Sequence, residues 1–323
     1  MKGSGTLVSG QSRPLATLTL NPAVDISYDI PRLIPDQKSH ASSTRYDPGG
    51  NGINVGRALR ELHVNARNFC VIGGNSGILF EKLLENQIDH VFCQRVEGET
   101  RMNGTIIQSD PPVQYEVTGV GPNVPSSILD DLCLKFIDAC RGGVGILAGS
   151  IPQGVPEDIY GRLVNRLREE GTLSVVDAHG NLLQNAIHEH PFLIKPNRYE
   201  LSLLLGRTLS RFEDVAEEAR ILQRGGISYV CVSLGEEGAI LVGPEGSFFA
   251  KAPPVIVKCT VGSGDSMLAG LVASLSSGRS QSDALRLAVA CGSGTSAQPG
   301  TAIFTYDQLN VLLKQTEVMQ LDI

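Results

Sequence analysis

The order of apolar and polar residues predicts regular alternation of helices and strands over most of the chain. From residue 126 onward, amphipathic stretches of helical period alternate with short, continuous apolar runs. The helical stretches are residues 126–140, 157–170, 198–205 and 213–224, and the apolar runs are residues 144–150, 173–177, 192–194 and 229–235. Such alternation indicates a mostly parallel sheet with helices on both faces. The predicted fold class is α/β.

The N-terminal third adds segments in which apolar and polar residues alternate one by one. Residues 16–20 form a first apolar strand, residues 24–30 alternate, and a similar exposed segment lies within 99–119. Alternation with a period of two is typical of a sheet with one face in water. We expect residues 25–46 and 99–119 to form one small sheet. Asp25 lies where the first strand meets this sheet, and it either caps a turn or faces a ligand.

A glycine turn precedes a helix at Thr260–Ser266, whose sequence is Thr-Val-Gly-Ser-Gly-Asp-Ser. Glycines let successive backbone N–H groups converge, and such a group of donors at a helix N-terminus binds anions. Asp265 lies at the mouth of this turn. Its carboxylate either caps the helix or accepts a proton from a substrate hydroxyl while the turn holds a phosphoryl group. This stretch alone permits both interpretations.

A second glycine turn, Asp47–Gly56, also opens a helix. Its glycine spacing superficially resembles a dinucleotide fingerprint, which must follow a buried strand. Residues 43–48 are too polar for such a strand, so we favour a turn that lets the backbone and Asn54 approach a sugar. A plain helix start is the other interpretation.

Several polar residues and one glycine follow the apolar strands directly. They are Ser150, Asp177, Lys195, Asn197, Ser233 and Gly235. In open parallel sheets, ligands bind beyond the carboxyl ends of the strands. These residues are therefore expected to lie together, although any one of them can be only a turn residue.

Composition limits the classes of binding partner and the cellular compartment that we expect for this chain. The 323 residues carry a net charge of −7, which argues against nucleic acid or an acidic membrane as the main partner. No apolar run approaches the ~18 residues that span a bilayer. The seven cysteines include no Cys-x-x-Cys pair, which favours a reducing, cytoplasmic location without disulfides or structural zinc.

The domain organisation follows from the same patterns. We expect a disordered, Gly/Ser-rich N-terminal tail over residues 1–14, one domain over residues 15–316 and a C-terminal tail over residues 317–323. No Walker-type phosphate loop is present. An anion-binding turn with an adjacent carboxylate suggests transfer of a charged group to a hydroxyl.

Three stretches together resemble the PfkB family of carbohydrate kinases, in its order and spacing. They are Gly49–Val55, Lys195–Glu200 and Thr260–Ser266. The resemblance extends over residues 15–316, and Leu18–Asp25 is similar to the phosphosugar kinase branch. It implies a ribokinase-like three-layer α/β sandwich with a small β-sheet lid, and ATP-dependent phosphorylation of a sugar phosphate. The implied cofactors are ATP and Mg²⁺, with a monovalent cation as a further candidate.

The resemblance also implies roles for individual residues. Asp265 would be the base that deprotonates the acceptor hydroxyl, and the backbone N–H groups of Gly262, Ser263 and Gly264 would hold the transferred phosphoryl group. Serine at 263 departs from the alanine usual in the family but leaves the backbone intact. The implied sugar-phosphate ligands are Asp25, Lys38, Gly50, Asn54, Arg101 and Ser150, with Lys38 and Arg101 near the phosphate. The implied nucleotide ligands are Lys195, Asn197, Ser233 and Gly235, and Asn197 and Glu200 would organise Mg²⁺ through water.

Asn51 bears on the choice of sugar. Lysine is usual at this position in 1-phosphofructokinases and tagatose-6-phosphate kinases, and glycine in minor-type 6-phosphofructokinases. This difference favours fructose 6-phosphate, with tagatose 6-phosphate and fructose 1-phosphate as alternatives. In this branch lids pair in a homodimer, so Arg101 could act across the interface. A non-catalytic sugar-phosphate sensor and a dinucleotide oxidoreductase are the competing functions.

Overall fold

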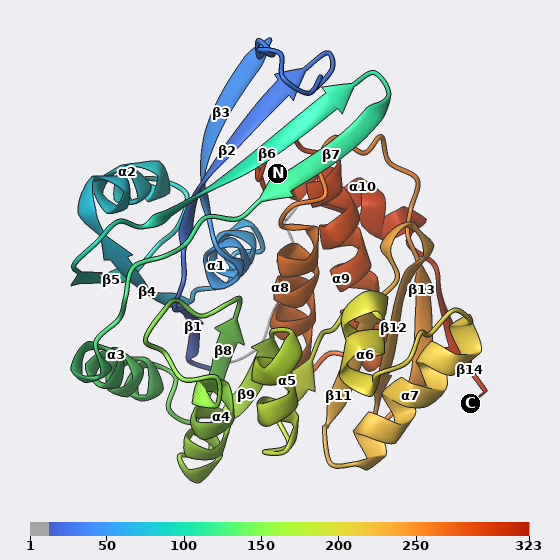
Figure 1. The fold of residues 1–323 in the computed structure, drawn as a ribbon. Helices are drawn as coiled ribbons and strands as arrows, with labels where there is room; N and C mark the ends of the chain where they lie inside the picture. The colour runs from blue at the N-terminus through green and yellow to red at the C-terminus, as the bar shows by residue number, and fades with distance from the viewer. Residues whose placement is uncertain (1–12, 323) are drawn as a thin grey trace, which may run out of the picture.

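The computed structural model describes residues 13–322, which form two β-sheets and ten α-helices (Figure 1). Residues 1–12, within the tail expected to be disordered, and Ile323 lie outside the described residues. The strands are β1 (Leu15–Thr19), β2 (Ala23–Ile30), β3 (Ser43–Gly49), β4 (Arg67–Gly73), β5 (Val91–Val96), β6 (Arg101–Ser109), β7 (Pro112–Val117), β8 (Val144–Ala148), β9 (Leu173–Asp177), β10 (Leu193–Ile194), β11 (Tyr229–Ser233), β12 (Gly238–Gly243), β13 (Gly246–Lys251) and β14 (Val318–Leu321). The helices are α1 (Asn51–Glu61), α2 (Gly74–Leu84), α3 (Ser126–Ala139), α4 (Ile159–Glu169), α5 (Gly180–Ile187), α6 (Arg198–Leu205), α7 (Phe212–Arg224), α8 (Ser263–Ser276), α9 (Gln281–Ser296) and α10 (Tyr306–Gln315).

The large sheet has ten strands in the order β14-β13-β12-β11-β10-β9-β8-β1-β4-β5. The seven strands from β11 to β5 in this order are parallel, and β12, β13 and β14 are antiparallel additions. The predicted α/β class and mostly parallel sheet are therefore confirmed. The expectation of a tail from residue 317 needs correction, because Val318–Leu321 pair with β13 as an edge strand.

Helices cover both faces of the large sheet, which gives three layers. On one face, α1, α8, α9 and α10 pack on side chains such as Val144 and Ile146 of β8. On the other face, α3, α4, α5 and α7 pack on side chains such as Leu147. Burial of both faces explains why the strands read as continuous apolar runs. Within residues 13–322, no helix is both long enough and apolar enough to cross a membrane.

The chain reverses its direction across the sheet between β1 and β8. From β1 it proceeds outward through β4 to β5, then returns to β8 and proceeds the other way through β9, β10 and β11. Crevices form at such a reversal, beyond the carboxyl ends of the two strands. Asn21 and Ser150 follow β1 and β8 at this point, and Nδ2 of Asn21 donates to Oγ of Ser150 at 3.1 Å.

The small sheet has the order β3-β2-β6-β7 and lies above α1 and α8 (Figure 1). Directly opposed residues share a face of a sheet. Asp47, Asp25 and Asn103 form one polar cross-strand row on the first face. The opposite face carries the apolar rows Tyr46-Ile26-Gly104-Val117 and Thr44-Tyr28-Ile106-Tyr115. The predicted alternation therefore separates a polar face from an apolar one.

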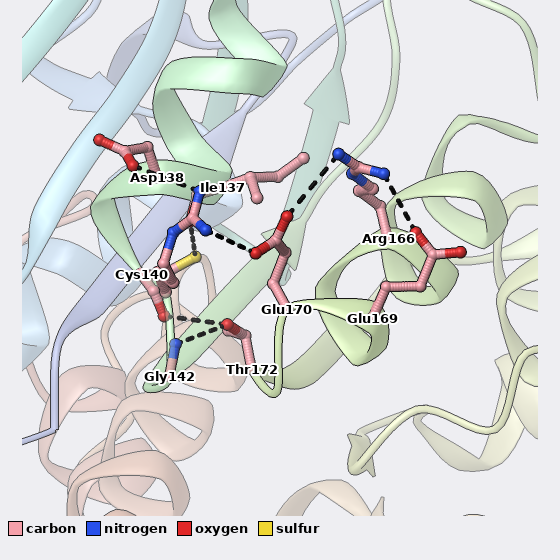
Figure 2. Close-up of polar contacts among 9 residues, drawn as sticks. Ile137, Asp138, Cys140, Gly142, Arg166, Glu169, Glu170 and Thr172 are labelled. Atoms are coloured by element: carbon pink, nitrogen blue, oxygen red, sulfur yellow. Dashed lines mark hydrogen bonds and ion pairs between the residues drawn. The ribbon is translucent and has the colours of Figure 1, made fainter.

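A cluster of polar side chains connects the segments that lie at the amino-terminal ends of β8 and β9, opposite the carboxyl ends of these strands (Figure 2). Oγ1 of Thr172, just before β9, accepts from the backbone N–H of Gly142 at 2.9 Å and donates to the carbonyl of Cys140 at 3.3 Å. Glu170 pairs with Arg141 at 2.7 Å and with Arg166 at 3.7 Å. These contacts join the segments that lead into β8 and β9, away from the crevice.

Candidate active site

Two helix N-termini meet at the crevice between β1 and β8. The first belongs to α1, which begins after Gly50 with φ of 107°. Asn54 of this helix is buried, and its Nδ2 donates to Oδ2 of Asp265 at 2.9 Å. The side chain of Asn51 also lies near Asp265 and lowers the pKa of its carboxyl. The glycine turn near residue 50 and the carboxylate at 265 are therefore brought into direct contact, across 211 residues of sequence.

The second N-terminus belongs to α8, which carries Asp265 in its first turn. Gly262 precedes this helix in the left-handed region, with φ of 80°, a conformation that favours glycine. Ser263 bonds back to the Thr260 carbonyl through both its hydroxyl, at 2.7 Å, and its N–H, at 3.2 Å. Gly264 and Asp265 lie in the first helical turn, where the N–H groups have no intrahelical acceptor. Of the three predicted anion-hole donors, Gly262, Ser263 and Gly264, the N–H of Ser263 is thus engaged by Thr260, whereas that of Gly264 has no intrahelical acceptor.

The environment of Asp265 raises the pKa of its carboxyl from 3.8 to about 7. Burial is the main cause, and the negative charge of Asp177 adds to it, while Asn54, Lys195 and Asn51 act in the opposite sense. Asp265 is only 6% exposed. A carboxyl that titrates near neutral pH is suited to general-base work, because it is ionised in part and basic enough to take a proton.

A buried ion pair flanks Asp265. Nζ of Lys195, after β10, lies 3.3 Å from Oδ2 of Asp177 at the end of β9, and both side chains are at most 8% exposed. Burial alone would lower the pKa of Lys195, but the carboxylates of Asp177, Glu200 and Asp265 outweigh it, so its pKa is raised and the ammonium stays charged. A Cβ on Gly264 would lie 3.2 Å from this Nζ. Lys195 therefore places a positive charge at the start of α8.

Asp25 lies on the small sheet above the crevice. Nδ2 of Asn103, opposite it on β6, donates to Oδ1 of Asp25 at 2.8 Å. A Cβ on Gly49 would lie 2.1 Å from Oδ2 of Asp25, so only glycine leaves room for the carboxylate. Burial raises the pKa of Asp25 to about 6, although Asn103 and the charge of Arg101 oppose the shift. The carboxylate is held in a fixed position as a hydrogen-bond acceptor.

The residues predicted to bind the sugar phosphate do not all come together. Arg101 begins β6, and its Nε donates to the Asn21 carbonyl at 3.0 Å, so its guanidinium lies near Asp25 and Ser150 in the same chain. Lys38 lies instead in the exposed connection of residues 31–42, at the opposite end of β2 and β3 from Asp25. Within one chain, Lys38 is remote from the crevice.

The predicted nucleotide residues are adjacent to one another. Asn197 and Glu200 form a capping box at the start of α6, with two bonds of 2.8 Å. Asn197 also pairs with Ser233, and Gly235 follows with φ of 64°. The capping box needs only one carboxylate oxygen of Glu200, Oε2. The capping box leaves Oε1 of Glu200 free of that interaction, but within residues 13–322 no group of three or more His, Cys, Asp or Glu side chains is arranged to hold a metal ion directly.

The sequence analysis overlooked several polar residues that shape this site. Asn103 and Asn21 lie in stretches interpreted only as strand and turn, and Arg57 reads as a solvent-facing residue of a helix. Asp177 is identified as a strand-end residue but not as the partner of Lys195. Asn103 could have been found from its position opposite Asp25 in the alternating segments. The burial of Arg57 has no signal in the sequence.

Known proteins resemble the chain in both sequence and fold. Residues 18–308 match the family described as pfkB family carbohydrate kinase. The chain is 31% identical over 295 residues to 1-phosphofructokinase from Bacillus subtilis (strain 168), covering 91% of this chain and 96% of the relative. It is 31% identical over 293 residues to ATP-dependent 6-phosphofructokinase isozyme 2 from Escherichia coli (strain K12), covering 90% and 95%. The crystal structure of Phosphofructokinase-2 from Escherichia coli in complex with substrates and products superposes with a TM-score of 0.89 at 29% identity, covering 93% and 98%.

Proposed function

The chain belongs to the pfkB family of carbohydrate kinases, phosphotransferases that act on a sugar hydroxyl, and we propose that its crevice transfers the γ-phosphoryl group of ATP to fructose 6-phosphate. The observation that carries the proposal is the position of Asp265, buried at the N-terminus of α8 and held by Asn54 at 2.9 Å. A carboxylate beside the N-terminus of a helix supports the proposal, because transfer of a phosphoryl group to a hydroxyl requires a base and a group that binds the anion.

The chemistry follows from the surrounding charges. Asp265 accepts the proton of the acceptor hydroxyl, whose oxygen attacks the γ-phosphorus as ADP leaves. The N–H groups at the start of α8 and the ammonium of Lys195 stabilise the negative charge on the phosphoryl oxygens. Such transfer depends mostly on positioning and charge stabilisation, which these groups supply. Asp25 and Ser150 orient the sugar, and Arg101 binds its phosphate in the same chain.

Mg²⁺ is the proposed metal, held through water by Glu200 and Asn197, and it would neutralise charge on the ATP phosphates. Potassium is a further candidate, because Phosphofructokinase-2 from Escherichia coli has been crystallised in complex with potassium and superposes with a TM-score of 0.88. Either ion would be tested by its removal, with the sodium salt as the control for the monovalent cation.

The small sheet is proposed to serve both as the lid and as a homodimer contact. Its polar face carries Asp25 toward the crevice, whereas Tyr46, Tyr115 and Val117 on the other face are 48%, 43% and 66% exposed. An exposed apolar face of this kind marks an interaction surface. Phosphofructokinase-2 from Escherichia coli, a relative in fold, has been crystallised in a tetrameric inhibited form. In a dimer through the lids, Lys38 at the lid tip could approach the partner.

Fructose 1-phosphate is the second candidate, favoured by the identity to the Bacillus subtilis 1-phosphofructokinase. The two sugars differ in which end carries the phosphate and which carries the acceptor hydroxyl. In both sugars the phosphate lies at the end away from the reacting hydroxyl, so geometry at the base does not separate them. The preference for fructose 6-phosphate rests on Asn51, which stands where lysine is usual in 1-phosphofructokinases.

A coupled ADP-release assay tests the proposal. Mg-ATP is supplied with fructose 6-phosphate, fructose 1-phosphate or tagatose 6-phosphate, and kcat/KM is compared. We expect the highest kcat/KM with fructose 6-phosphate. A higher value with either other sugar would overturn the substrate assignment. Sugar-phosphate binding without ADP release from any of the three would support a sensor instead.

A further inference from the structure

Arg57 is a buried arginine on α1, one turn after Asn54. Only 4% of it is exposed. The two hydrogens of its Nη1 are shared among three acceptors: the Pro48 carbonyl at 3.1 Å, the Thr301 carbonyl at 3.0 Å and Oδ1 of Asn54 at 3.1 Å. These acceptors belong to the small sheet, to the loop after α9 and to α1. One guanidinium thus joins three elements directly behind the proposed base.

Burial of this charge is costly, and within residues 13–322 no carboxylate forms an ion pair with it at 4.0 Å or less. Burial lowers the pKa of Arg57 to about 10, while the more distant charges of Asp47, Asp25 and Asp265 oppose the shift. An apolar side chain would fill the same space without this desolvation. The retained charge therefore requires a reason other than packing.

The hydrogen bonds of Asn54 suggest that reason. A carboxamide has an oxygen that accepts and a nitrogen that donates. In this structure Oδ1 faces Arg57 and Nδ2 faces Oδ2 of Asp265. Without Arg57 the amide could rotate and turn its oxygen toward the carboxylate, which would repel it. Arg57 accepts no hydrogen bond, so it permits only the productive orientation.

We propose that Arg57 is a positioning residue for the phosphoryl transfer. It holds Oδ1 of Asn54, so that the Asn54 N–H stays directed at Asp265. Through Pro48 and Thr301 it also fixes this arrangement to the small sheet and to the loop after α9. The inference rests on the proposed role of Asp265 as the base.

The expected kinetic signature is a loss of turnover rather than of binding. Arg57→Met should lower kcat by about 10- to 100-fold, because small displacements of a reacting group have effects of this size. KM for ATP and for the sugar phosphate should change less than about threefold. Arg57→Lys, which keeps a charge and a donor but not the planar fork, should fall between Met and wild type. Arg60→Met is the matched control, since Arg60 is an exposed residue of the same helix that pairs with Asp89.

The pH profile separates positioning from a structural role. Asp265 faces Asp177 from β9 and Lys195 from β10, while Asn51, Asn54 and Arg57 face it from α1. The substitution Arg57→Met removes one positive charge from this set and also removes the group that holds the Asn54 side chain in its orientation. Both losses favour the protonated carboxyl, so the acid limb of kcat should move up by about half a pH unit or more. Arg57→Lys should leave the limb near its wild-type position.

A double-mutant cycle with Asn54→Leu completes the test. If Arg57 acts through Asn54, Arg57→Met should reduce kcat less than about threefold in the Asn54→Leu background. An equal reduction in both backgrounds, or an unmoved acid limb, would overturn the proposal. Should Arg57→Met fail to fold by circular dichroism, Arg57→Lys in the same cycle decides: a loss of kcat that is as large in the Asn54→Leu background as in wild type would overturn the proposal. Absence of ADP release from wild type would instead refute the proposed function, so the two failures are distinct.

Discussion

The carboxylate of Asp265 lies in surroundings that disfavour its charge. Burial and the neighbouring Asp177 raise its pKa to about 7, against an ordinary value of 3.8. Between these two values the folded chain holds a proton that the unfolded chain has released. The contribution of this group to stability is thus complete below about pH 4 and is lost as the pH rises to 7. The feature that suits Asp265 to act as a base destabilises the fold above neutral pH.

Replacing this carboxylate should therefore stabilise the protein at alkaline pH. We expect Asp265→Asn to have a larger free energy of unfolding than wild type at pH 8, because the amide carries no charge to bury. At pH 5, where the folded wild type is already protonated at this position, the difference should shrink. Urea unfolding at the two pH values measures it. A variant equally stable or less stable than wild type at pH 8 would contradict the assigned environment.

At the residue scale, the sequence predicted the positions of Asp265 and Asn54 at helix starts, but it did not predict the residues that hold them in place. Asp265 and Asn54 are recognisable because each follows a glycine turn at the start of a helix. Arg57 is not, since an arginine in a polar helical position is typical of a solvated face. Its burial results from packing of α1 beneath the small sheet and against the loop after α9. Local pattern contains no information about such long-range contacts.

At the scale of elements, α1 supplies more of the site than the others do. Asn51, Asn54 and Arg57 point from it toward the crevice, while Val55, Ala58 and Leu59 pack in the core. The helical period thus divides one element into a functional side and a packing side. Prediction from sequence is reliable where that period is clear. Prediction was less reliable near the C-terminus of the chain. There, Val318–Leu321 form a strand only because the backbone groups of β13 are available for pairing.

A substitution at the amino-terminal ends of β8 and β9 should lower the stability of the fold without changing turnover. Thr172 is buried and bonds the N–H of Gly142 and the carbonyl of Cys140, as Figure 2 shows. Thr172→Val leaves the Gly142 N–H without this partner, whereas the Cys140 carbonyl keeps the N–H of Gly143 at 2.8 Å, and the change should destabilise the fold by about 1–2 kcal/mol. We expect kcat and both KM values to remain at wild-type levels, since the crevice lies at the other edge. Urea unfolding measures the loss of stability, and steady-state kinetics measure kcat and KM. A tenfold loss of kcat would contradict the prediction that this region affects stability alone.

At the scale of the whole molecule, topology assembles the site. The chain reverses its direction between β1 and β8, and the small sheet lies above α1 and α8 (Figure 1), with Asp25 and Asp47 on its polar face. The sequence allowed this arrangement to be predicted, because the strand-end residues and the alternating segments were visible in it. It did not reveal that Lys38 lies at the far tip of the small sheet, since the length of a connection does not give its direction.

The apolar face of the small sheet predicts the oligomeric state. Tyr115→Lys introduces a charge on that face, on the edge strand β7, and should convert a homodimer into monomers, as measured by sedimentation velocity. Val311→Lys is the control, because Val311 is 56% exposed on α10, outside the small sheet. A monomeric wild type, or a variant that dimerises as well as wild type, would contradict pairing through the lids.

Turnover of the Asp265→Asn variant tests the central claim most directly. With Mg-ATP and fructose 6-phosphate, the coupled assay should show kcat reduced by roughly two or more decades, the contribution of a general base. KM for ATP should stay within about threefold of wild type, because the carboxylate contacts the acceptor side. A folded variant with turnover near wild type would contradict the assignment of Asp265 as the base of this kinase.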